Sequence, residues 1–282
     1  MHKTDFTISS FVASDGYPMV VTRWPAAEGA SRGRVVVLHG VQSHGGWYHG
    51  LGQTLSEQGF DVSFPDRRGS GSNTQDRGHA PSARRLINDI VELLTTTRNE
   101  SPHLPTTLVG ISWGGKLATV AAARRPDLVD GLALICPGLH PRVGVSPRDR
   151  LRIFLAFLFH RRKLFPIPLA DPALFTDNPD RRAYIAADPL SLHEATASLL
   201  AASVIIDRLV ARARRRVRAR TLLMLAGRDR IVDNARTLRY FQGMTVPDRT
   251  LIEYPEGCHT LEFDPDPTRY ALDLAAWLAR ES

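Results

Sequence analysis

A serine between two glycines is the residue of this sequence best placed for nucleophilic chemistry. Ser112 is the centre of Gly-Ile-Ser-Trp-Gly at 110–114. An apolar pair at 108–109 precedes it as the end of a predicted strand, and 117–125 favours a helix. Glycines on both sides let the two backbones pass closely while the serine occupies a sharp turn. The pattern predicts a nucleophile elbow, because an ordinary turn with an N-capping serine does not need both glycines.

An acid and a histidine follow this serine in the order that such chemistry requires. A serine hydroxyl attacks only when a histidine accepts its proton and a carboxylate holds that histidine. Asp229 follows an apolar, strand-like segment that ends at Ala226, and His259 lies on a loop between a predicted strand and the closing helix. We therefore predict a catalytic triad of Ser112, Asp229 and His259, in the chain order expected for an elbow on a parallel sheet.

Two neighbouring residues are alternatives to members of this triad. Asp233 is a second candidate acid, but it directly precedes the helix predicted at 235–241 and suits a capping role. Cys258 is a second candidate nucleophile, but it has no elbow of its own. We therefore assign the acid to Asp229 and the nucleophile to Ser112.

The loop after the strand predicted at 35–38 is a candidate to stabilise the negative charge that develops during nucleophilic attack. Residues 35–38 are continuously apolar, as buried parallel strands are, and His39-Gly40 follow them. Backbone N–H groups in such a loop, together with that of the residue after the nucleophile, can bind a developing oxyanion. We assign the N–H groups of Val41 and Trp113 to this oxyanion hole, and expect His39 to make structural hydrogen bonds behind it.

The other histidines of this loop have different predicted roles. His44 is expected to line the substrate pocket. His39, His44 and His49 do not predict a metal site, because no carboxylate or cysteine joins them at ligand spacing. Asp66 and the two arginines after it are expected to hold a tight turn at the same edge of the sheet.

The elements that must position these residues follow an α/β alternation with one interruption. After a β-hairpin, short apolar strands alternate with amphipathic helices up to Cys136, and the alternation resumes at Thr221. Prolines and helical patches at 150–159 and 191–210 fill the interval. We predict one domain in three parts: an α/β core at 1–137, a lid insertion at 138–219, and the rest of the core at 220–282.

The predicted lid contains an apolar segment followed by basic residues. Phe154 and Phe157 are candidates for lining an acyl pocket, and simple packing of the lid on the core is the alternative. Residues 151–159 are mostly apolar and 160–163 are basic, so this segment could also contact a membrane surface.

Composition excludes several classes of protein. The chain has 282 residues, of which 43% are hydrophobic, and no segment approaches the roughly 20 apolar residues of a membrane-spanning helix. The net charge of +7 comes from arginine, with three lysines in all. No zinc spacing or RNA-binding signature predicts nucleic-acid binding. Two cysteines and an N-terminus without a signal-peptide pattern predict a cytoplasmic protein.

These motifs together resemble the α/β-hydrolase superfamily, and within it the monoacylglycerol lipase/lysophospholipase branch, also called the serine aminopeptidase S33-like hydrolases. The resemblance implies a mostly parallel central sheet with helices on both faces, an inserted lid or cap, and ester hydrolysis without a cofactor. Trp113 departs from the methionine, leucine or glutamine common in the family, and 138–219 carries no family motif. The resemblance rests on the segments 39–48, 66–71, 110–115, 229–233 and 257–262.

The first functional hypothesis is a serine hydrolase that cleaves a small carboxylic ester with an apolar acyl group through an acyl-enzyme. An acyltransferase, a thioesterase or a C–C bond hydrolase would use the same triad on another bond or acceptor. A non-catalytic receptor with a hydrolase fold is the third hypothesis. No feature of the sequence determines the oligomeric state.

Overall fold

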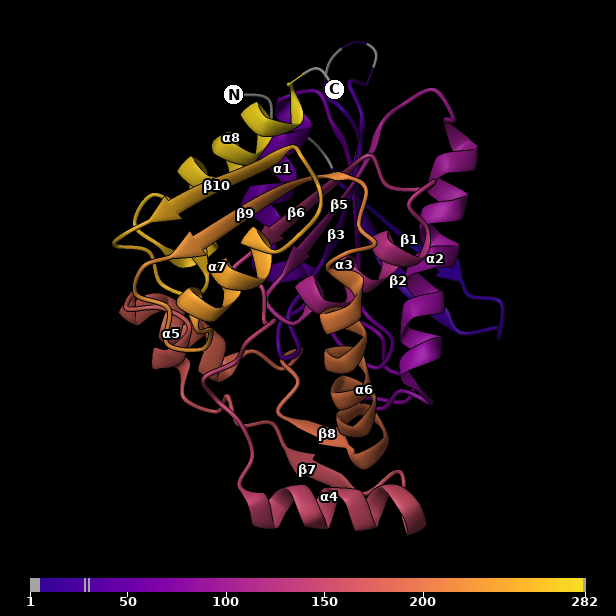
Figure 1. The fold of residues 1–282 in the computed structure, drawn as a ribbon, viewed down its shortest axis with the longest axis vertical. Helices are drawn as coiled ribbons and strands as arrows, with labels where there is room; N and C mark the ends of the chain where they lie inside the picture. Colours follow the sequence, from indigo (N-terminus) through magenta and orange to yellow (C-terminus); the bar gives the residue numbers. More distant parts are fainter. Residues whose placement is uncertain (1–5, 28, 30, 281–282) are drawn as a thin grey trace.

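A twisted sheet of eight strands forms the centre of the computed structural model, which describes residues 6–280 apart from 28 and 30 (Figure 1). The strand order is β1-β2-β4-β3-β5-β6-β9-β10. β1 and β2 form an antiparallel hairpin, and β2 is antiparallel to β4. The other six strands of the sheet, β4, β3, β5, β6, β9 and β10, are parallel to one another. The strands are β1 (Thr7–Val12), β2 (Pro18–Trp24), β3 (Arg34–Leu38), β4 (Asp61–Pro65), β5 (Thr106–Ile111), β6 (Gly131–Ile135), β9 (Arg220–Ala226) and β10 (Arg249–Tyr254).

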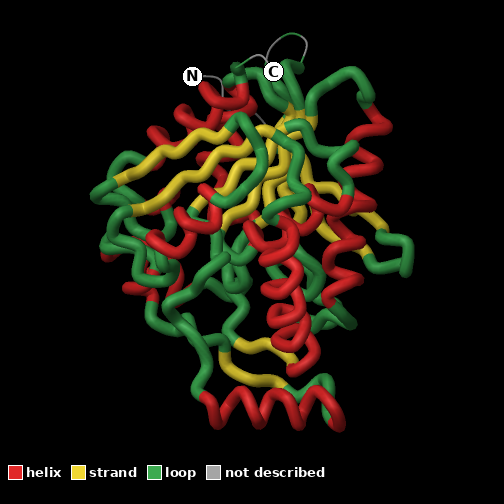
Figure 2. The backbone as a smooth tube through the Cα atoms, in the orientation of Figure 1, coloured by secondary structure: helices red, strands yellow, loops and turns green. Residues whose placement is uncertain are grey.

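Helices cover both faces of this sheet (Figures 1 and 2). α1 packs against α8 on one face, and α2 packs against α3 on the other. All six residues of β5 are buried, because helices cover a parallel strand on both sides. The helices outside the insertion are α1 (His49–Glu57), α2 (Ala83–Glu100), α3 (Gly114–Arg124), α7 (Asn234–Gln242) and α8 (Pro267–Leu278). The mostly parallel α/β architecture predicted from the sequence is confirmed.

The chain between β6 and β9 departs from the strand–helix alternation. It contains a long helix α4 at one end of the molecule and a two-stranded antiparallel ribbon next to it (Figure 1). The helix predicted at 191–210 begins later, at Ala197. Residues 194–196 instead pair as a strand, and the Thr196 hydroxyl caps the helix that follows. The elements are α4 (Pro147–Phe159), β7 (Leu164–Pro166), α5 (Pro179–Ala187), β8 (Glu194–Thr196) and α6 (Ala197–Ala213).

A buried carboxyl group between α1 and α8 makes the stability of the fold depend on pH. Glu262 accepts hydrogen bonds from the Gly50 N–H at 2.8 Å and from the Tyr270 hydroxyl. Burial nevertheless raises the pKa of Glu262 from its usual 4.5 to about 7. Between these two pH values the folded chain binds the proton more tightly than the unfolded chain. The free energy of unfolding therefore falls as pH rises through this window.

We expect Glu262→Gln to remove this dependence, because glutamine stays neutral. The unfolding free energy of the variant minus that of the wild type should therefore increase by on the order of 2 kcal/mol between pH 4.5 and pH 8. Urea denaturation at a series of pH values measures the difference. A difference between the two proteins that does not change with pH would contradict the prediction.

Candidate active site

The turn after β5 holds Ser112 in a strained backbone conformation. Its φ of +51° lies in the left-handed region that non-glycine residues rarely adopt. The flanking positions require glycine because a side chain at either of them would collide with neighbouring backbone atoms. A Cβ on Gly110 would lie 2.6 Å from the Gly115 Cα, and one on Gly114 would lie 2.3 Å from the Leu38 carbonyl oxygen. The turn therefore has the tight geometry of a nucleophile elbow, and it projects the serine above the end of the strand.

The structure brings the three predicted triad residues together. The His259 Nε2 lies 2.9 Å from the Ser112 Oγ, and the His259 Nδ1 lies 2.8 Å from the Asp229 Oδ2. The other carboxylate oxygen of Asp229 accepts the N–H groups of Ile231 and Val232, each at 2.8 Å. With the carboxylate accepting at Nδ1, the imidazole can accept a proton at Nε2. Asp229 and His259 are both buried, which protects this hydrogen-bonded pair from water.

The loop after β3 lies directly beside the nucleophile. A Cβ on Gly40 would lie 3.3 Å from the Ser112 Cβ, so glycine lets this backbone come close. Val41 and Trp113 both line the cavity in front of Ser112. Within the described part of the chain, neither of their backbone N–H groups donates a hydrogen bond to another backbone group. Neither N–H group is thus used by another backbone group, as the predicted oxyanion hole requires.

His39 holds this loop through both ring nitrogens. Its Nδ1 lies 2.8 Å from the Gly40 carbonyl oxygen, and its Nε2 accepts the Arg67 N–H at 2.8 Å. Burial lowers the pKa of His39 to about 3, so the ring is neutral and donates from Nδ1 to Gly40. These contacts agree with the structural role predicted for this histidine.

A cavity of about 760 Å³ opens in front of Ser112. Phe154 and Phe157 of α4 line it, together with residues of α3, α6 and the loops between β6 and β9, and their contact with an acyl chain stays a prediction. Leu155 and Leu158 of the same helix do not line the cavity, and their side chains are exposed. The further apolar lining residues include Val143, Val145, Ile153, Ile167, Leu169, Leu199, Leu200, Val204, Ile205 and Ile231.

The prediction that His44 lines the substrate pocket is wrong. Its ring is buried, and its Nε2 lies 2.9 Å from the Asp188 Oδ2, outside the cavity lining. Asp188 follows α5 and also accepts the Trp47 Nε1–H at 2.7 Å. Burial opposes ionisation of this carboxyl, but the hydrogen bonds from Trp47 and His44 outweigh it and lower its pKa. Together with Trp47, His44 therefore fastens the segment after α5 to the loop after β3, because both side chains contact the buried Asp188 carboxylate.

The alternative acid Asp233 and the alternative nucleophile Cys258 contact residues outside the triad. The Asp233 side chain accepts the Arg236 N–H and caps α7, as its position before that helix predicted. The Cys258 thiol faces Asp177, and burial raises its pKa, which suppresses the thiolate. Asp66 holds its turn through the N–H groups of Gly45 and Ser72. Among the residues that the structure describes, no cluster of three histidine, cysteine or acidic side chains could hold a metal.

Comparison with known proteins places this geometry in a family. A family model described as serine aminopeptidase, S33 matches residues 29–266. The chain belongs to this family. It is 26% identical over 273 residues to a monoacylglycerol lipase of Mycolicibacterium smegmatis, with 95% of each chain covered. A monoglyceride lipase of Rattus norvegicus is 25% identical over 274 residues, which cover 95% of this chain and 89% of the relative.

Solved structures agree with the family assignment. The monoacylglycerol lipase of Paleococcus ferrophilus superposes with a TM-score of 0.82 at 25% identity, covering 92% of this chain and 98% of the other. A monoglyceride lipase variant from Saccharomyces cerevisiae has a TM-score of 0.83 at 18% identity and shares the fold, covering 99% and 96%. This S33-family protein is an α/β-hydrolase that hydrolyses carboxylic esters.

Three polar features of the hydrolase site were not predicted from the sequence. The Trp113 Nε1 donates to the Ser203 Oγ of α6 at 2.9 Å, and the Lys116 Nζ lies 2.6 Å from Asp207 on the same helix. The Arg67 guanidinium lies over the Trp113 ring. All three depend on contacts between segments far apart in the chain. Only the unusual tryptophan after the serine was a signal that the surroundings of the elbow differ here.

Proposed function

We propose that the protein hydrolyses monoacyl esters, of the kind represented by monoacylglycerols, through a Ser112–His259–Asp229 triad and an acyl-enzyme. The observation that carries the proposal is the pair of hydrogen bonds that links Asp229 to His259 and His259 to the Ser112 hydroxyl. Ser112 also lines a large, mostly apolar cavity. The names of the relatives support the same substrate class.

The geometry supports the following steps. His259 Nε2 removes the Ser112 proton as Oγ bonds to the ester carbonyl carbon, and negative charge develops on the carbonyl oxygen. The N–H groups of Val41 and Trp113 stabilise that oxyanion. The bond to the alcohol then breaks, and His259 returns the proton to the leaving oxygen. Water repeats the sequence on the acyl-enzyme and releases the carboxylic acid, while Asp229 stabilises the cationic imidazole in both halves.

The cavity supports an ester with one acyl chain. Its volume lies within the range of roughly 300–1,000 Å³ that holds ligands of this size, and its lining is mostly apolar. Phe154 and Phe157 of α4 form part of the wall that an acyl chain would contact. Because the wall comes largely from the insertion, we assign residues 138–219 the role of a lid that selects the acyl group.

Assays with a series of monoacylglycerols of increasing chain length test this function. We expect release of free fatty acid and glycerol by the wild type, and no release by Ser112→Ala. A triacylglycerol of the same long acyl chain should react far more slowly, because a cavity of about 760 Å³ is too small for three long chains. A folded wild type that releases no acid from any monoacyl ester would contradict the proposal.

The exposed face of α4 supports contact between the lid and a membrane surface. Leu151, Phe154, Leu155, Leu158 and Phe159 are each between 47% and 73% exposed on this helix. The basic segment 160–163 follows it directly, so anionic headgroups would complement its charge. No helix among the described residues is long and apolar enough to span a bilayer, and contact with one leaflet does not require such a helix.

Flotation with vesicles of an anionic and a zwitterionic phospholipid checks this membrane contact. We expect the wild type to float with the anionic vesicles, and the double variant Leu155→Ser/Phe159→Ser to lose most of this binding. Both of these side chains lie outside the cavity lining. Hydrolysis of a water-soluble ester by the variant should therefore be unchanged, which serves as the control. Equal flotation of both proteins would contradict the contact.

A further inference from the structure

The side chain of Arg67 contacts both residues of the proposed oxyanion hole. Its Nη2 donates to the Val41 carbonyl oxygen at 2.8 Å. Its guanidinium carbon lies 5.0 Å from the centre of the Trp113 ring, in cation–π geometry. The residue comes from the loop after β4, whereas Val41 follows β3 and Trp113 follows β5. One side chain thus links the two separate segments that must place their N–H groups around one oxygen atom.

Arg67 also acts on the same loop through its backbone. Its N–H donates to the His39 Nε2, and the His39 Nδ1–H donates to the Gly40 carbonyl oxygen. The Gly40 carbonyl and the Val41 N–H belong to one peptide plane and point in opposite directions. Holding the carbonyl therefore sets the direction of the N–H. The guanidinium holds the next carbonyl along the chain, so the Val41 peptides are restrained on both sides.

Stability does not explain why an arginine occupies this position. Arg67 is 5% exposed, and its Nε and Nη1 have no hydrogen-bond partner among the described residues. Burial lowers the pKa of Arg67 to about 10, and the nearby Asp66 offsets this effect only in part. A buried cation without a carboxylate partner costs folding free energy, and an apolar side chain of similar size would not.

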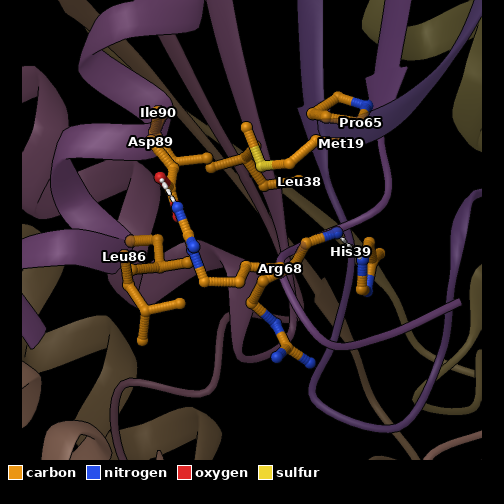
Figure 3. A pocket seen from close by; sticks show the side chains of 10 residues that line it. Met19, Leu38, His39, Pro65, Arg68, Leu86, Asp89 and Ile90 are labelled. Carbon is orange, nitrogen blue, oxygen red and sulfur yellow. Dashed lines mark hydrogen bonds and ion pairs between the residues drawn. The ribbon is translucent and has the colours of Figure 1, made fainter. Parts of the chain in front are cut away.

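The neighbouring Arg68 shows the opposite arrangement and gives a matched comparison. Its guanidinium makes two hydrogen bonds of 2.8 Å to Asp89 of α2 and one of 2.9 Å to Asp15. Figure 3 shows Arg68 extended toward Asp89 and away from the His39 ring. Arg68 also lies over the Tyr17 ring. Its contacts are those of a structural residue that joins α2 to the first hairpin.

We infer that Arg67 is a positioning residue of the oxyanion hole, which holds the Val41 loop and the Trp113 indole in the geometry that receives the oxyanion. The inference rests on the proposed function and extends it. The indole is also restrained at its edge, where the Nε1–H donates to the Ser203 hydroxyl of α6. The core and the insertion therefore both restrain Trp113, with Arg67 acting from the core.

Steady-state kinetics and thermal unfolding of Arg67→Met, Arg67→Lys and Arg68→Met test the inference. For Arg67→Met we expect kcat to fall roughly 10-fold or more, with KM within about two-fold, because the oxyanion forms only in the transition state. Its Tm should stay unchanged or rise. Arg67→Lys should recover part of kcat through a hydrogen bond to Val41. Arg68→Met should lower Tm and leave kcat of the folded protein unchanged.

The outcomes separate this inference from the proposed function. A purely structural Arg67 would lower Tm together with activity, as expected for Arg68, and this result would overturn the inference. Wild-type kcat in folded Arg67→Met would overturn it as well, while leaving ester hydrolysis by the triad intact. A wild type that neither hydrolyses esters nor reacts with a fluorophosphonate would overturn the proposed function, and the positioning role with it.

Discussion

Ser112→Ala is expected to abolish ester hydrolysis, with kcat falling by roughly 10⁶-fold. The loss follows from the chemistry, because Ser112 is the one hydroxyl among the described residues that is hydrogen-bonded to His259. Ser203 also lines the cavity, but its hydroxyl accepts the Trp113 indole N–H. The histidine at the elbow, His259, is hydrogen-bonded to Ser112. Alanine has the same backbone restrictions as serine, so the fold and Tm should change little.

Labelling with a fluorophosphonate measures this prediction without knowledge of the natural substrate. The reagent phosphonylates a serine whose proton a neighbouring base can accept. The wild type should be labelled, whereas Ser112→Ala and His259→Ala should not. Ser203→Ala is the matched control, since it removes a cavity hydroxyl that no histidine activates, and it should remain labelled. Label retained on Ser112→Ala would show that another residue is the nucleophile.

Asp229→Asn is expected to lower kcat by roughly 10⁴-fold while keeping the fold. The backbone N–H groups of Ile231 and Val232 both donate to the Asp229 Oδ1. They would hold the amide oxygen of an asparagine at the same position, which directs its NH₂ group toward the His259 Nδ1. The imidazole would then accept a hydrogen bond at Nδ1 and carry its proton at Nε2. In that tautomer it cannot take the proton of Ser112.

Measurement of kcat and Tm for Asp229→Asn, with Asp233→Asn as control, checks this argument. Asp233 carries the same charge four residues later, but its carboxylate caps α7 and does not contact His259. We expect Asp233→Asn to retain nearly all activity, because asparagine is also a good helix cap. Similar losses in both variants would indicate a general effect of negative charge rather than the orientation of the imidazole.

The sequence by itself determined the fold class and the residues that meet at the end of the sheet. A glycine on each side of Ser112 and apolar strand-like segments before Ser112 and Asp229 encode local structure, so they are readable without tertiary information. In a parallel sheet the carboxyl ends of the strands lie at one edge, which brings the three residues into hydrogen-bonding distance. Their catalytic roles stay a prediction until the variants are measured.

Tertiary structure alone decided the surroundings of these residues. His44 faces Asp188 from 144 positions away, and Trp113 is held between Arg67 and Ser203. No local pattern predicts such pairs, because the free energy of a buried polar group depends on which partner the completed fold places beside it. The insertion that supplies Ser203 and most of the cavity wall carries no periodic strand–helix signal. The shape of the cavity therefore depends on how the insertion packs against α3, which the sequence does not specify locally.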